Sequence, residues 1–79
     1  MYDKIWAELS QKDRGGLYAI ASTTGGKIFD IRKYLDMETN EFNPYRKRLI
    51  NKGLIQGDRR GYVFFQLPYF EDYVLDTYV

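Results

Sequence analysis

The middle of the chain carries side chains of the types that bond nucleic acid. Lysine and arginine pair with phosphate oxygens, and asparagine and arginine can each make two hydrogen bonds to a purine edge. In a helix that turns by about 100° per residue, the side opposite Tyr45 and Leu49 would face a partner and not the core. The sequence therefore offers a candidate DNA-binding surface, made of Asn43, Lys47 and Asn51 on that side of the helix, Arg46 at its edge, and Arg59 and Arg60 in the following turn.

Positive charge is concentrated in the same part of the sequence. The formal net charge is only +1, but residues 42–66 carry six basic side chains against Asp58 alone. Residues 1–41 carry six basic and seven acidic side chains, and residues 67–79 carry three acidic ones. The basic stretch favours an anionic partner, although lysine and arginine also cover ordinary solvent-facing helices and hairpin tips. Charge alone leaves both interpretations open.

The composition excludes several kinds of chemistry. With no Cys and no His among 79 residues, the chain cannot form a disulfide, a thiolate or imidazole metal site, or a nucleophile activated by histidine. The scattered carboxylates Glu71, Asp72 and Asp76 lack a partner that would tune a pKa for acid–base catalysis. We therefore expect a single non-catalytic domain that uses no metal and no cofactor.

The same composition bears on location. Unbroken apolar runs such as Leu17 to Ala21 and Tyr62 to Phe65 are far shorter than the roughly 20 residues that span a bilayer, and no charged-then-apolar leader opens the chain. The absence of cysteine suits the reducing cytoplasm. We expect a soluble, cytoplasmic protein with no membrane partner.

The spacing of apolar residues predicts the helices that precede the basic region. Residues 2–9 predict a short helix or a docked arm, and Ser10 is expected to cap a second helix. After the turn-rich "STTGGK", a short extended piece precedes Asp30, which is expected to cap the next helix. The apolar stripes of these segments are Ile5, Trp6 and Leu9, then Leu17, Ile20 and Ala21, then Ile31, Tyr34 and Leu35.

Two glycines interrupt the helix that Ser10 opens. Gly15 and Gly16 each cost about 1 kcal/mol relative to alanine in a helix interior. Either packing compensates for that cost, or the backbone is approached closely at this point.

The basic helix has marked ends. Asn43 is expected to be its N-cap, Pro44 its first residue and Gly53 the left-handed residue after its end, which predicts a helix over residues 44–52. Arg48 and Lys52 would flank its core side. "LIQG" and "YVFFQL" then predict a β-hairpin with a charged tip, and Pro68 ends its second strand. A closing helix follows, with an apolar stripe of Phe70, Tyr73, Val74 and Thr77.

The chain is rich in aromatic residues, with eight Tyr and five Phe. These rings could serve as platforms on which bases stack. Tyr62 and Phe64 alternate along a strand, however, and Phe70 and Tyr73 share a helix stripe, which favours packing in the core. Trp6 is expected to cover the edge of the core.

The order of these elements resembles a winged helix-turn-helix domain over residues 10–68, and "NPYRKRLINKGLI" resembles its third helix and the exit from it. The resemblance implies an α+β fold with a three-helix core, a short strand, a two-stranded β wing and an extra C-terminal helix. It also implies that helix 44–52 docks in the major groove of double-stranded DNA, with the wing at residues 58–61 on the backbone.

A narrower resemblance involves "YRKRLINKGLI" and "RRGYVFFQLPYFEDYV". These stretches are similar to the C-terminal winged-helix domain of archaeal-type and related bacterial AAA ATPases. That similarity implies a domain excised from a longer chain that binds ATP through a separate module. The present sequence lacks such a module, since "TTGGK" is too short to be a phosphate-binding loop. The alternative is a regulatory module that contacts a protein or the neighbouring ATPase domain and binds no DNA.

Overall fold

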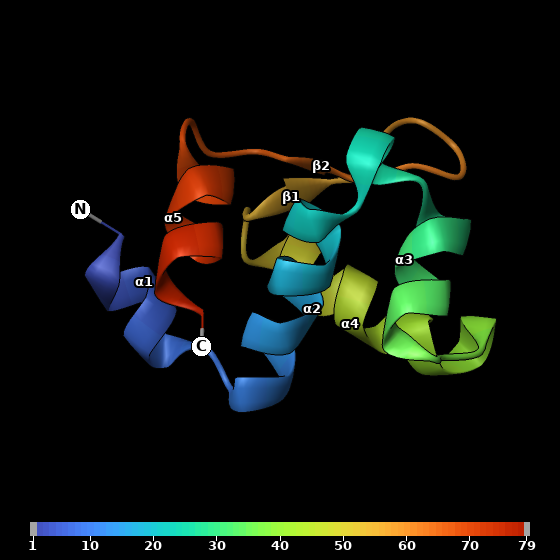
Figure 1. Ribbon diagram of the computed structural model, residues 1–79, viewed down its shortest axis with the longest axis horizontal. Coiled ribbons are helices and arrows are strands. Elements are labelled where there is room, and N and C mark those ends of the chain that lie inside the picture. The colour runs from blue at the N-terminus through green and yellow to red at the C-terminus, as the bar shows by residue number, and fades with distance from the viewer. Residues whose placement is uncertain (1, 79) are drawn as a thin grey trace.

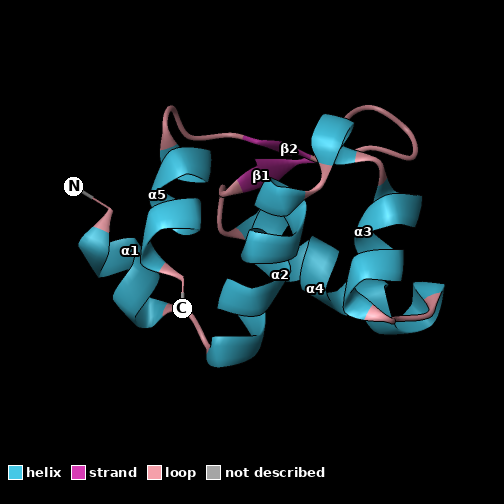
Figure 2. Cartoon of the chain, in the orientation of Figure 1, coloured by secondary structure: helices cyan, strands magenta, loops and turns pink. Residues whose placement is uncertain are grey.

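The structure is a computed structural model that describes residues 2–78. It is an α+β fold in which α2 lies in the middle, with α1 and α5 on one side and α3 on the other (Figure 1). The two antiparallel strands lie together at one end of the helices (Figure 2). The elements are α1 (Asp3–Glu8), α2 (Gln11–Ser22), the 3-10 turn η1 (Thr24–Gly26), α3 (Ile28–Leu35), α4 (Thr39–Asn51), β1 (Ile55–Gln56), β2 (Phe64–Phe65) and α5 (Phe70–Thr77).

The central helix α2 forms as its sequence predicts. The hydroxyl of Ser10 accepts a hydrogen bond from the backbone N–H of Asp13 at 3.1 Å, which confirms Ser10 as the N-cap. Leu17, Ile20 and Ala21 are buried, as expected for the core stripe. Because α2 contacts α3, α4 and α5, it is the element around which the others are arranged.

The start of α3 differs from the prediction. Asp30 was expected to be the N-cap after a short strand, but Lys27 is the N-cap and Asp30 lies within the first turn. Lys27 pairs with Tyr62 in a single β-bridge, and the N–H of Ile28 donates to the carbonyl of Gly61 at 2.9 Å. That pairing ends the extended piece after one residue, so the helix begins at once.

The predicted start of the basic helix is wrong. The helix predicted over 44–52 is α4, which begins at Thr39, so Asn43 and Pro44 lie inside it. The N–H of Glu38 donates to the Glu41 carboxylate at 3.1 Å, half of a capping box that stabilises a start five residues earlier. Burial of Phe42, which is 1% exposed, stabilises the same extra turn.

The predicted end of that helix is confirmed. Gly53 has a φ of 76° and directly follows the C-cap residue Lys52, so it takes the left-handed position that favours glycine.

The predicted hairpin is present but short. Ile55 pairs with Phe65 and Gln56 with Phe64. A further backbone hydrogen bond joins the N–H of Val63 to the carbonyl of Gly26 at 2.9 Å. Gly26 has a φ of 69°, and a Cβ there would overlap the Val63 carbonyl, so this close approach requires glycine.

The N-terminal segment is fastened to the closing helix α5. The hydroxyl of Tyr2 donates to the carbonyl of Pro68 at 2.7 Å, and the hydroxyl of Tyr73 donates to the Asp3 carboxylate. The second bond raises the pKa of Tyr73 above its ordinary value, because the bond is lost when the phenol ionises. Trp6 is buried, as expected for a residue that covers the core edge.

The two glycines in α2 have ordinary helical backbone angles, since neither is among the residues with positive φ. A Cβ on Gly16 would lie 3.9 Å from Tyr45 and 4.0 Å from Leu49, which is normal contact. A Cβ on Gly15 would lie 3.3 Å from the hydroxyl of Tyr78, which is tight but involves the end of a side chain. Close packing with the rest of the chain therefore does not require glycine at position 16.

We expect Gly16→Ala to raise the free energy of unfolding by about 0.5–1 kcal/mol, because alanine loses less backbone entropy in a helix than glycine does. Urea denaturation followed by circular dichroism measures the change. Gly26→Ala is the matched control and should destabilise the protein, because its left-handed φ and its contact with Val63 exclude a Cβ. A loss of stability in Gly16→Ala would contradict this interpretation of α2.

Candidate nucleic-acid interface

One side of α4 carries exposed polar residues. Asn43, Lys47 and Asn51, which we call the outward stripe, follow one another at intervals of four residues and are all exposed. Leu49 is fully buried on the other side of the helix, and Tyr45 is half-buried. The predicted division of α4 into a core side and a solvent-exposed side is therefore confirmed, although the helix starts earlier than expected.

Arg46 lies at the edge of the outward stripe and is half-buried against the hairpin. Its Nη2 donates to the carbonyl of Gly57 at 3.3 Å, while among the described residues its buried Nε has no hydrogen-bond partner. A Cβ on Gly57 would overlap the guanidinium, so a larger residue there would displace the Arg46 side chain from this contact. Arg46 thus connects α4 to the end of β1, a contact that helical spacing alone could not reveal.

Arg48 is committed to an ion pair within the chain. Its Nη2 lies 2.8 Å from Oδ1 of Asp13, whose side chain is only 7% exposed. The guanidinium also lies over the ring of Tyr45, with 4.7 Å from Cζ to the ring centroid. The hydrogen bond from Arg48 to Asp13 raises the pKa of Arg48, in opposition to a smaller effect of burial. The Asp13 carboxylate, whose pairing with Arg48 the sequence does not indicate, therefore fastens α4 to α2.

The tip of the hairpin presents two arginines. Arg59 and Arg60 are exposed, and Cζ of Arg59 lies 4.6 Å from the centroid of the Tyr62 ring. The rings of Tyr62 and Phe64 are parallel to within 3°, with 6.2 Å between their centroids. The ring of Tyr62 thus supports the Arg59 guanidinium beside the tip.

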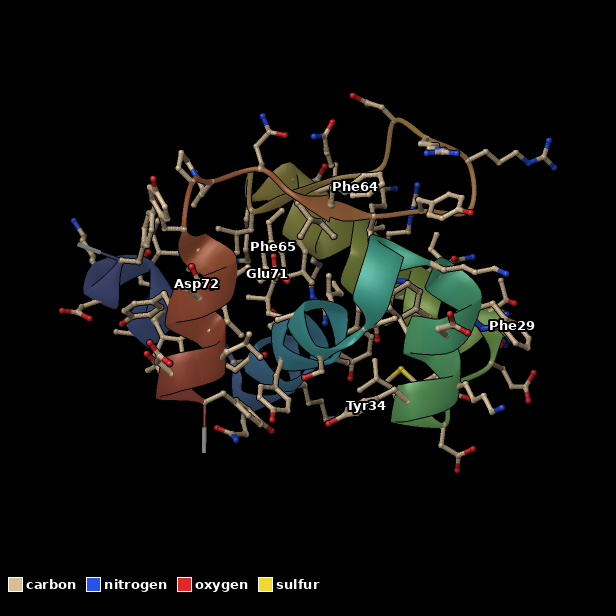
Figure 3. All side chains as sticks on the ribbon, turned by 45° about the horizontal axis from the view of Figure 1, so that its top comes forward. Phe29, Tyr34, Phe64, Phe65, Glu71 and Asp72 are labelled. Carbon is tan, nitrogen blue, oxygen red and sulfur yellow. The ribbon has the colours of Figure 1, made fainter. Side chains whose placement is uncertain are left out.

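The aromatic residues of the hairpin depart from the expected core packing. Val63 is fully buried, but Phe64 is 37% exposed and points away from it, because neighbouring residues of a strand face opposite sides (Figure 3). Phe29 and Tyr34 of α3 are also exposed and extend from different sides of that helix (Figure 3). The prediction of core packing holds for Phe70, which is buried, and is wrong for Phe64.

Two further properties concern the described residues as a whole. Within residues 2–78, no group of three or more metal-ligating side chains lies close enough to hold a metal ion. In the same range, no helix combines the length and the apolar character needed to cross a membrane.

One family model matches residues 1–74 of the chain, and it is described as a domain of unknown function (DUF8462). No curated protein and no solved structure matches the chain.

We expect Arg48→Met to lower the free energy of unfolding by about 1–3 kcal/mol, because it leaves the buried carboxylate of Asp13 without its partner. This loss of stability is smaller than the loss for a fully buried ion pair, because the Arg48 side chain is 48% exposed and water screens the interaction. Urea denaturation gives the difference.

Lys52→Met, also on an exposed side chain at the end of α4, is the matched control and should change stability by less than about 0.5 kcal/mol. The double variant Asp13→Leu with Arg48→Met should recover much of the loss, since no buried charge remains. Equal stabilities for Arg48→Met and Lys52→Met would show that the ion pair does not hold α4.

Proposed function

The chain belongs to the DUF8462 family, and we propose that it is a winged-helix domain that binds double-stranded DNA through α4 and the β1–β2 loop. The outward stripe carries the proposal. Its two asparagines and one lysine are exposed together on the side of α4 that faces away from the core. Asparagine can bond an adenine edge with two hydrogen bonds, and lysine can bond guanine or a phosphate.

The order of elements supports the proposed fold. Three helices, α2, α3 and α4, are followed by a two-stranded hairpin, and Lys27 between α2 and α3 pairs with Tyr62 of that hairpin. This order is that of a winged helix-turn-helix, in which the last of the three helices enters the major groove. The β1–β2 loop is the wing in this arrangement.

The charges of the region limit how many phosphates it can contact. Of its six basic side chains, Arg46 donates to Gly57 and Arg48 pairs with Asp13. The exposed remainder is Lys47, Lys52, Arg59 and Arg60. We therefore infer about four phosphate contacts, which predicts an affinity that falls steeply with salt.

We also propose that the domain works as part of an ATPase. The support is the resemblance of residues 45–55 and 59–74 to the C-terminal winged-helix domain of AAA ATPases. A separate module would bind ATP. The winged helix would bring DNA to that module or hold that module on DNA.

A second candidate function is favoured by the surface around α5. Tyr69 is 80% exposed with a left-handed φ of 61°, and Leu75 is 41% exposed. A tyrosine held in that conformation is strained, and strained exposed residues gather at binding surfaces. In this alternative the domain contacts a protein and binds no DNA.

The DNA proposal is tested by fluorescence anisotropy of a labelled duplex of about 20 base pairs. With about four phosphate contacts, binding should weaken about 100-fold between about 50 mM and about 200 mM salt. Lys47→Ala should weaken binding about tenfold at the lower salt, because it removes a central residue of the outward stripe. Arg59→Ala with Arg60→Ala should reduce the salt slope by about two contacts.

The matched control is Lys4→Ala, which removes one exposed lysine from α1 and should leave binding unchanged. Arg46→Ala is avoided, because it would also release the hairpin from α4. No binding at about 50 mM salt, or equal effects of Lys47→Ala and Lys4→Ala, would overturn the proposal. NMR shifts confined to residues 2–9 and 69–78 on addition of a protein partner would favour the second function.

A further inference from the structure

A hollow of about 350 Å³ lies between α2, the end of α3, α4 and Tyr78, which follows α5. Leu35, Met37, Tyr45 and Tyr78 supply an apolar and aromatic lining, and Gly15 and Gly16 of α2 form part of its wall. Pockets that take small molecules have such volumes and such linings, with a few polar groups that fix the orientation of the ligand.

The glycines are the first argument that the hollow is used. Each costs free energy in a helix interior, and neither has a backbone angle that requires glycine. Gly16 meets only ordinary contacts at the position of a Cβ, so packing within the chain does not account for it. Gly16 is buried, whereas Gly15 is partly exposed at the hollow, so bare backbone at Gly15 is accounted for if a molecule from outside the chain approaches α2 there.

Charge is the second argument. Lys12 lies at the same hollow together with Gln11, and it is exposed. The nearby carboxylate of Asp13 is neutralised by Arg48 at 2.8 Å. Asp36 and Glu38, which flank Met37 in the sequence, line a different hollow beside Phe29. The uncompensated charge at this site is therefore positive.

The hydroxyl of Tyr78 is a third feature of the site. It lies over Gly15, 3.3 Å from the position that a Cβ would occupy, so a hydrogen-bond donor reaches the glycine wall. An apolar hollow with a phenol hydroxyl and one lysine offers burial for an apolar body and two partners for an anionic oxygen.

We propose that this hollow binds a small amphipathic carboxylate, with its aromatic or aliphatic body against Leu35, Met37 and Tyr45 and its carboxylate directed to Lys12. The site uses the Tyr45 side of α4, whereas the outward stripe occupies the opposite side. The two sites are separate, so this inference does not depend on DNA binding.

Phenylacetate is a suitable probe because it joins one aromatic ring to one carboxylate. Titrated to about 10 mM and followed in amide NMR spectra of the isotope-labelled full chain, it should shift the resonances of Gly15 and Gly16 with a dissociation constant of about 1 mM, ordinary for so small a ligand. The neutral analogue 2-phenylethanol should bind about threefold more weakly, since it lacks the charge that Lys12 pairs with.

Variants distinguish the contribution of the Lys12 charge to binding from the contribution of the shape of the hollow. Lys12→Gln should weaken phenylacetate about threefold and leave 2-phenylethanol unchanged, whereas Gly15→Ala should weaken both because its methyl group enters the hollow. Lys4→Gln, on α1, is the matched control and should change neither.

Three results would overturn the proposal. They are the absence of shifts at Gly15 and Gly16, shifts centred on Lys47 or Arg59 in their place, and equal binding of the acid and the alcohol to the unaltered protein. None of these results bears on the anisotropy measurement with DNA, so the two proposals can fail separately.

Discussion

Phe42 and Leu49 lie two turns apart on α4 and are both buried, so that helix can sit against the core in one rotation only. The ion pair between Arg48 and Asp13 holds the same rotation from the side of α2. The exposure of the outward stripe depends on this constraint. A rotation of α4 by a third of a turn would bury part of the outward stripe and expose Leu49, at a cost of about 1.5–3 kcal/mol for that side chain alone.

The hairpin is placed by contacts from two distant parts of the chain. Arg46 holds the end of β1 against α4 through the carbonyl of Gly57. The backbone of residues 26–28 pairs with residues 61–63 through hydrogen bonds of 2.9 Å. The second contact requires glycine at position 26, because the Val63 carbonyl lies where a Cβ would be, and in the first a Cβ on Gly57 would displace the Arg46 guanidinium. These two contacts thus hold the hairpin that carries Arg59 and Arg60 against the helices.

The helix α4 consequently has two sides that serve different purposes. The outward stripe presents polar and charged groups to solvent, and the side of Tyr45 closes an apolar hollow against α2. Arg48 lies between them, where it neutralises Asp13 and covers the ring of Tyr45. Because of that pair, Lys12 remains the uncompensated charge beside the hollow, and the carboxylate that would have opposed an anionic ligand is neutralised.

Much of the secondary structure was predictable because the signals act over a few residues. Ser10 caps α2, Gly53 ends α4, and the apolar spacings of α2 and α5 match their buried sides. The start of α4 was not predictable in this way. Asn43 and Pro44 make a good local start, but Glu38 with Glu41, together with the burial of Phe42, stabilises a longer helix.

By itself, the sequence determined which residues are able to meet an anionic partner and which side of the basic helix is buried. Only the tertiary structure decided which of the basic residues remain available. Arg48 is paired with a residue 35 positions away, and Arg46 bonds to one 11 positions away. The residue spacing of a helix or a strand predicts neither contact. Such pairs exist only once the elements have packed, because packing brings their partners within hydrogen-bond distance and removes the water that would compete for them.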